Sequence, residues 1–303
     1  MYLRNTNFLT LFAFAILTAF IKWSISFYFF PESLDTKILH ESVADANLYY
    51  PLIKFLSDLN FSYSFDPEIS ELKTVPLPVW GIFFHAISFK IFGYLTFIIM
   101  DILCIFIVIA IFYKIYCFSF ENRLSICLSI FIFLTPLIIA NTHLINAQYL
   151  WLFGETFYTL RVPRPMISNI YFFCFILLVL KMTYEKFYDY KNFIFVGVIL
   201  GFSLSSFYYH FFTEIIFLLF FLIYKFKSSI ILEIKNNFKF YLIFSLSFLI
   251  ASLPFILNLA LHESEFTNRQ CIFTLDVEIK KKVLYYFISK YLSLKGLILI
   301  LGI

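Results

Sequence analysis

The sequence is poor in charged residues, which make up only 14% of its 303 residues. Hydrophobic residues account for 62%, and the mean hydropathy is +0.89. A soluble domain carries about 25% charged residues. The shortage of charge therefore excludes a soluble globular fold and indicates that a lipid bilayer surrounds most of the chain.

Cysteine is also scarce, with five in the chain. Only Cys271 falls in a segment that we expect outside the membrane, and no two cysteines have the spacing of metal ligands. The sequence therefore indicates neither a disulfide framework nor a zinc site, and we assign no metal-ligand residues. The net charge is only +4, and the dispersed Lys and Arg residues give no case for nucleic-acid binding.

What the sequence does contain is a series of long apolar runs. Because an α-helix rises about 1.5 Å per residue, about 20 apolar residues cross the hydrocarbon core of a bilayer. A membrane β-barrel would show alternating segments of about 10 residues, whereas residues 97–111 are apolar on every side apart from Asp101. The pattern predicts an all-α, polytopic transmembrane helical bundle. About eight spans are expected, at residues 8–30, 94–118, 124–140, 166–183, 193–207, 211–224, 240–258 and 283–303.

The distribution of Lys and Arg orients these spans, because positive charge accumulates on the cytoplasmic side. Arg4 and the basic residues of alternate loops lie on one side, which we expect to be cytoplasmic. We predict a single membrane domain of residues 1–303 in the plasma (inner) membrane, with a cytoplasmic N-terminus. The apolar run 296–303 has no charged tail, which is typical of a C-terminally truncated chain. The segments expected to face outward are 31–93, 141–165 and 259–282.

The outward first loop, residues 31–93, is the strongest functional clue because a loop of this size is usually retained for a purpose. Its apolar residues predict a short amphipathic helix on the membrane surface, with Asp45 just before it. A second apolar segment, residues 79–92, is too short to span comfortably, so we expect an interfacial or re-entrant helix that carries His85. The amphipathic stripe consists of Leu52, Phe55, Leu56 and Leu59.

Three sequence segments resemble those of a known family: DANLYYPLIKFLSDL, PLPVWGIFFHAISFKIFG and RVPRPMISNIYFF. With the order of one span, an acidic outer loop and a Pro-rich lead into the next span, the chain resembles the GT-C superfamily of integral-membrane glycosyltransferases over about residues 1–225. It departs from the family in that Asp45 is followed by Ala46 instead of a second acidic residue, and in that Pro51 lies inside the matching helix.

The resemblance implies transfer of a hexosyl or pentosyl sugar from a polyprenyl-phosphate donor to a glycan, lipid or protein acceptor at the outer face. Asp45 would be the general base, or would hold a divalent cation such as Mg²⁺ or Mn²⁺, and Asp35 is the rival carboxylate. Arg161 and Arg164 would bind the lipid phosphate. The alternatives are that Asp45 caps a surface helix and that the two arginines contact lipid headgroups.

Further candidates for substrate binding are polar residues near the outer ends of spans. Asp101 is notable because an ionisable group within a span is rare and usually faces the protein interior. The remaining candidates are His143 and Glu155 in the loop before the fourth span, His210 and Glu214 one helical turn apart, and His85.

A different class of function remains open, namely a transporter or flippase for a lipid-linked or polar solute. Asp101, His210 and Glu214 would line its path, but the sequence shows neither paired broken helices nor an inverted repeat. An O-antigen-polymerase-like protein would carry its main loop late in the chain, and the long first loop counts against that reading.

Overall fold

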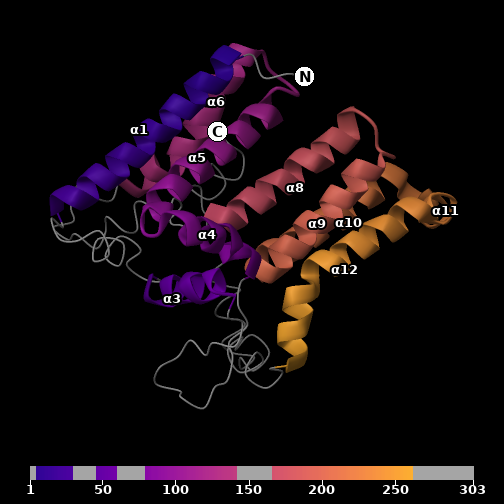
Figure 1. Cartoon of the computed structure of the whole chain (residues 1–303). Coiled ribbons are helices and arrows are strands. Elements are labelled where there is room, and N and C mark those ends of the chain that lie inside the picture. The colour runs from indigo at the N-terminus through magenta and orange to yellow at the C-terminus, as the bar shows by residue number, and fades with distance from the viewer. Residues whose placement is uncertain (1–4, 30–45, 60–78, 142–165, 262–303) are drawn as a thin grey trace, which may run out of the picture. The chain divides into compact units, whose positions relative to one another are not determined.

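The structure is a computed structural model, and it describes residues 5–29, 46–59, 79–141 and 166–261. The regular elements of these residues are all helices, without any β-strand, which confirms the all-α prediction. The chain divides into two compact units, residues 1–258 and 259–303. Nearly all of the described residues belong to the first unit (Figure 1). That the chain forms a single membrane domain stays a prediction.

Five helices of the described residues are long and apolar enough to cross a membrane, namely α1, α5, α8, α10 and α12. Three further apolar helices, α4, α6 and α9, have shorter apolar segments, over Val79–Phe92, Asn122–Thr135 and Tyr190–Ser206. The eighth expected span lies outside the described residues, so the number of about eight stays a prediction. The helices are α1 (Asn5–Phe29), α3 (Ala46–Ser57), α4 (Val79–Phe92), α5 (Leu95–Tyr116), α6 (Asn122–Asn141), α8 (Met166–Tyr184), α9 (Tyr190–Ser206), α10 (Tyr208–Phe226), α11 (Ile230–Asn236) and α12 (Phe238–Leu261).

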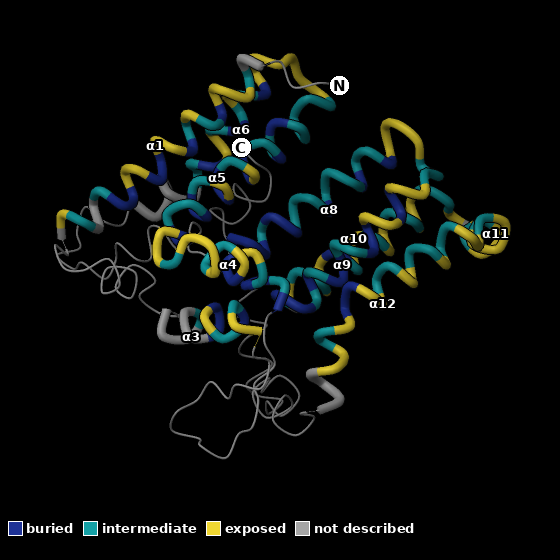
Figure 2. Tube along the Cα trace, in the orientation of Figure 1, coloured by how far each residue is buried: buried dark blue, intermediate teal, exposed yellow. Residues whose placement is uncertain are grey.

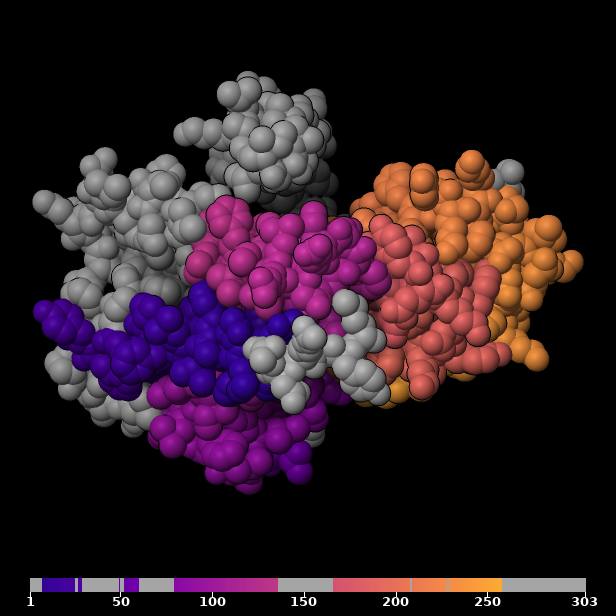
Figure 3. Space-filling model, turned by 90° about the horizontal axis from the view of Figure 1, so that it is seen from above, coloured from indigo at the N-terminus to yellow at the C-terminus, as the bar shows by residue number. Residues whose placement is uncertain are grey.

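Large apolar side chains cover the exposed surface of α10 and α12, which are drawn in orange in Figure 3. A contiguous apolar surface of this kind is unfavourable in water and favourable against lipid tails. The surface therefore supports a multi-pass membrane protein. Its members include Phe212, Ile216, Leu219, Phe220 and Ile223 on α10, and Leu246, Leu249, Ile250 and Leu253 on α12.

One hydrophobic core joins α1, α5, α6 and α8. On α1, Leu11, Ala15 and Ala19 recur every fourth residue and are buried, so they form one face of the helix. This face packs against α5, where Cys104 and Val108 belong to the same cluster. Figure 2 shows the buried positions of α1 recurring along the helix between exposed ones.

A second core joins α8, α9, α10 and α12 around the buried Phe175 and Leu200. Here Gly197 and Gly201 let α9 approach α12 closely. A Cβ atom at Gly197 would lie 2.1 Å from Ser247 Oγ, and one at Gly201 would lie 2.5 Å from Ala251 Cβ. Small residues four apart on one helix allow such close packing in membranes.

The two helices of the first loop pack together and against α1 and α5. The apolar face of α3 supplies Leu52, Ile53 and Leu56, which cluster with Val79 and Ile82 of α4. After α4, Gly93 adopts a left-handed conformation with φ of +55°. This conformation suits glycine and ends α4 just before α5 begins.

Trp80 joins α4 to three other helices. Its ring stacks on Phe202 of α9 with 4.4 Å between ring centroids. Its backbone carbonyl accepts a hydrogen bond of 2.7 Å from the Tyr171 hydroxyl of α8. Its Nε1 donates to the carbonyl of Ala251 in α12 over 2.7 Å. The last bond lies beside Pro254, which interrupts the hydrogen bonds of α12, and Figure 1 shows α12 bent in its C-terminal part.

Candidate functional site

Buried polar groups gather where several helices end close to α4. The C-terminal part of α1 and the start of α5 pack with α3 and α4. The start of α8 and the end of α9 contact Trp80, and the start of α10 contacts the start of α8 through His210 and Ser168. We call this side of the first unit the α4 end; in Figure 1 it is the side where α3 and α4 lie.

A buried ion pair at the α4 end joins α1 and α5. Lys22 Nζ lies 2.8 Å from Asp101 Oδ2, with side-chain exposures of 9% and 2%. Trp23 Nε1 donates a second hydrogen bond of 2.8 Å to the same oxygen. Two opposite charges satisfy each other inside an apolar bundle, where either charge alone would be costly. The pair fixes α1 against the second turn of α5.

A second buried carboxyl group belongs to Glu214 in the second turn of α10, and its residue is 0% exposed. Ser203 Oγ of α9 donates a hydrogen bond of 2.9 Å to Glu214 Oε1. Glu214 Oε2 has no hydrogen-bond partner, and the buried hydroxyl of Ser206 also lacks one. Ser203 and Ser206 are three residues apart and therefore share a face of α9. This corner of the bundle thus holds more polar oxygen atoms than it pairs internally.

His210 lies one turn before Glu214 and contacts α8. Its Nδ1 atom is 3.2 Å from the backbone carbonyl oxygen of Ser168. Its ring lies between two aromatic rings, with 5.2 Å between its centroid and that of Phe172 and 4.9 Å to that of Phe207. The ring is partly exposed, so it can form a boundary between the buried Glu214 and the surface.

His85 of α4 is fully buried, and neither of its ring nitrogens has a hydrogen-bond partner. Its ring lies 6.4 Å from that of Phe97, measured between centroids. The hydroxyl of Thr96, next to Phe97 in α5, is also buried without a partner. A neutral imidazole in these surroundings is compatible with a core residue, and its predicted contact with substrate stays a prediction.

A large apolar cavity of about 540 Å³ lies between α3, α4 and the bend of α12. Among the described residues that line it, Lys90 is the one basic side chain, and Lys90 Nζ makes an exposed ion pair of 2.8 Å with Asp58 Oδ1. The hydrogen bond from Lys90 holds the pKa of Asp58 below its usual value. The cavity is lined by Leu56, Ser57 and Leu59 of the first loop, by Val79, Trp80, Phe83, Ala86, Ile87, Lys90 and Ile91 of α4, and by Pro254.

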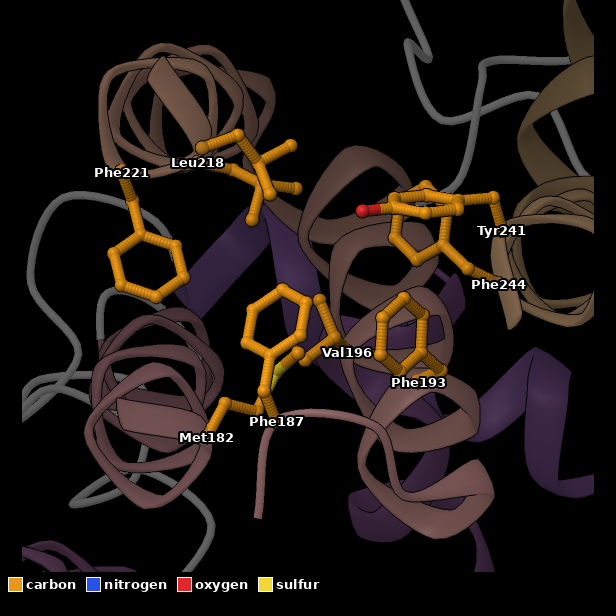
Figure 4. Close-up of a pocket in the computed structure, with 9 residues that line it drawn as sticks. Met182, Phe187, Phe193, Val196, Leu218, Phe221, Tyr241 and Phe244 are labelled. Carbon is orange, nitrogen blue, oxygen red and sulfur yellow. The ribbon is translucent and has the colours of Figure 1, made fainter. Parts of the chain in front are cut away.

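A second cavity, of about 50 Å³, lies between α8, α9, α10 and α12 (Figure 4). Figure 4 shows Tyr241 with its hydroxyl among apolar side chains. This volume is far below the range of about 300–1,000 Å³ found for ligand pockets. Close by, Tyr188 donates a hydrogen bond to Glu233 Oε1, and burial raises the pKa of Tyr188. This region ties α11 to the α8–α9 connection and has no evident chemical role.

Several of the predicted site residues lie outside the described residues, so nothing is stated of their positions. Their neighbours in the sequence are nevertheless placed. Asp45 directly precedes α3, and Arg164 comes shortly before α8. The structure places His210 and Glu214 near each other at the α4 end, while His85 lies in the separate α3–α4 cluster. The predicted site residues that lie outside the described part of the chain are Asp35, Asp45, His143, Glu155, Arg161 and Arg164.

Sequence reasoning missed the partners of the buried acids. Lys22 lies inside the first apolar run. Like Asp101, an ionisable residue within a span is expected to face the protein interior. The serines of α9 carry no such signal, because a serine in a membrane helix commonly bonds to its own backbone. The contacts of Trp23 and Trp80 were not predicted from the sequence either, and both residues donate hydrogen bonds within the bundle.

The described residues contain no group of three or more His, Cys, Asp or Glu side chains that could hold a metal ion. No protein-family model, curated protein or solved structure matches the chain. A functional assignment therefore rests on the residues themselves and on their geometry.

Proposed function

We propose that the protein is a membrane glycosyltransferase that transfers a sugar from a polyprenyl-phosphate-linked donor to an acceptor on the outer face of the membrane. In this proposal the N-terminus is cytoplasmic, the host membrane is the plasma (inner) membrane, and the α4 end faces outward. The acceptor is a glycan, a lipid or a protein with a free hydroxyl group.

The observation that carries the proposal is the apolar cavity between α3, α4 and α12. Its volume of about 540 Å³ lies in the range of ligand pockets. Its walls are almost wholly apolar, which suits a hydrocarbon chain, and Lys90 supplies a cation for an anionic headgroup. A polyprenyl phosphate combines these two chemical features in one molecule.

The expected catalytic carboxylate precedes the N-terminal end of the helix whose opposite end lines this cavity. Asp45 directly precedes α3, whose C-terminal residues Leu56 and Ser57 line the cavity. The N-terminus of a helix favours negative charge, which suits both a carboxylate and a phosphate. Arg161 and Arg164 precede α8, whose first turns pack near α4 through Tyr171.

The reaction would proceed by attack of the acceptor oxygen on the anomeric carbon of the donor sugar. The bond between that carbon and the phosphate oxygen breaks, and polyprenyl phosphate leaves with the bonding electrons. Asp45 accepts the proton of the attacking hydroxyl group, or holds a Mg²⁺ or Mn²⁺ ion against the departing phosphate, and Asp35 is the alternative carboxylate. Arg161 and Arg164 neutralise the leaving phosphate.

The test is turnover of radiolabelled polyprenyl-phosphate sugars in membranes that contain equal amounts of wild-type or variant protein. The variants are Asp45→Asn, Asp35→Asn and, as a control in the same loop, Asp66→Asn. We expect transfer by the wild type and by Asp66→Asn, and its loss in Asp45→Asn. Loss in Asp35→Asn alone would move the catalytic role to Asp35. No transfer by the wild type with any hexosyl or pentosyl donor would remove support for the enzyme.

The second candidate is a transporter or flippase for a lipid-linked or polar solute. The buried Asp101 and Glu214 favour it, because ionisable groups within membrane helices often mark a solute path. Against it, Asp101 is bonded to Lys22 and Trp23, while Glu214 is bonded to Ser203 on a different pair of helices. Movement of a labelled lipid-linked sugar across proteoliposomes without its chemical conversion would favour this candidate.

A further inference from the structure

The corner formed by α9 and α10 presents oxygen atoms without internal partners. Glu214 is fully buried, yet its Oε2 atom makes no hydrogen bond. The Ser206 hydroxyl is buried and lacks a partner as well. Buried polar groups are nearly always paired, so unpartnered oxygens on adjacent helices indicate a missing ligand.

The break between the two helices adds backbone carbonyl oxygen atoms, which also carry partial negative charge. The first helix, α9, ends at Ser206, and Phe207 is extended with φ of −152° and ψ of 90° before α10 begins. The last carbonyl groups of a helix have no amide partners within it, and the helix dipole makes this end negative. The Glu214 carboxyl group is thus bonded to Ser203, and Ser206 lies one turn further along the same helix at its C-terminal end.

This donor set is selective for one kind of ligand. All of its atoms are oxygens, which suit hard cations and not zinc or copper. It contains one carboxyl group, and the described residues hold no ion pair between Glu214 and a Lys or Arg. When this carboxyl group is ionised, its one negative charge matches one positive charge, whereas a divalent ion would remain uncompensated. Interrupted membrane helices bind Na⁺ in this manner.

We propose that Glu214, together with Ser203 and Ser206, binds a monovalent alkali cation at the α9–α10 break. The cation would join α10 to the end of α9 and thereby stabilise the corner that also holds His210 against α8. The proposal concerns binding alone and does not depend on the glycosyltransferase assignment.

The experiment is thermal unfolding of the full-length protein in detergent, in NaCl, KCl or choline chloride at equal ionic strength. For the wild type, we expect a saturable rise of the melting temperature in Na⁺ or K⁺ relative to choline. At ten times the Kd the rise is about 2 °C for a chain of this length. Glu214→Gln keeps the size of the side chain but removes its charge, so its melting temperature should be the same in all three salts.

Glu233→Gln is the matched control, because Glu233 bonds to Tyr188 and Asn237 and not to the α9–α10 break. This variant should keep the full cation response. If Glu214→Gln does not fold, Ser206→Ala replaces it, with an expected Kd at least several-fold weaker than that of the wild type. Equal melting temperatures of the wild type in all three salts would overturn the proposal, and so would a full cation response in Glu214→Gln or an unchanged Kd in Ser206→Ala.

Discussion

Replacing Gly201 by alanine should loosen the contact between α9 and α12. The added Cβ would lie 2.5 Å from Ala251 Cβ, 2.9 Å from the backbone nitrogen of Ser252 and 3.0 Å from the backbone carbon of Ala251. None of these atoms can move by a side-chain rotation. Ordinary contact begins at 3.4 Å, so α12 must retreat by about 1 Å or the helices must shift along each other.

The expected cost is about 1–3 kcal/mol of unfolding free energy, which is the range for overpacked sites. In water, alanine would recover about 1 kcal/mol through its higher helix propensity. In a membrane the separated helix is already fully hydrogen-bonded, so that gain is largely absent. The net effect of Gly201→Ala is therefore destabilising, and the movement of Ala251 also strains its hydrogen bond with Trp80.

Unfolding in rising SDS mole fraction, followed by tryptophan fluorescence, measures this cost. The double variant Gly201→Ala, Ala251→Gly moves the methyl group from one helix to the other and should recover part of the loss. Val198→Ile adds a carbon atom to a half-buried residue three positions before Gly201 on the same helix and should change stability little. A Gly201→Ala protein at least as stable as the wild type would refute the close approach of α9 and α12.

Two more substitutions test the polar contacts at the α4 end. Asp101→Asn leaves the Lys22 ammonium group buried without its countercharge and should cost about 3–5 kcal/mol of unfolding free energy. The double variant Lys22→Met, Asp101→Leu should unfold at a higher SDS mole fraction than Asp101→Asn. Equal stability of these two variants would contradict the ion pair. Trp80→Phe keeps an aromatic ring against Phe202 but removes the donor to Ala251, at a cost of about 0.5–1.5 kcal/mol. Hydrogen exchange of amides near Pro254 should then become faster, and unchanged rates there would show that the bond does not hold the bend.

The helices were largely predictable because membrane helices need continuous apolar runs. Proline and glycine gave the limits of α4, since Pro78 precedes it and Gly93 follows it. The break at Phe207 contains neither residue, yet it lies where the expected span 193–207 ends and before the next expected span begins at residue 211. Span number and orientation remain predictions, as does the GT-C resemblance.

The site was less predictable because its contacts join distant parts of the chain. Asp101 stood out in the sequence, but its partner Lys22 is 79 residues away. Trp80 bonds to Ala251 over a separation of 171 residues. Local periodicity contains no information on such pairings, which are set by how the helices pack. Glu214 and His210 were close in sequence, so their common location followed from helical spacing, whereas the role of Ser203 did not.

The Lys22–Asp101 pair has a consequence for how the protein is made. Each of these residues raises the cost of inserting its own helix, by up to about 3 kcal/mol at the centre of a span. The two are separated by 79 residues, and ribosomes add about 5–20 residues per second. About 4–16 s therefore pass between their syntheses. During this interval Lys22 has no acidic partner on α5, so the buried contact between α1 and α5 can form only after Asp101 has been made.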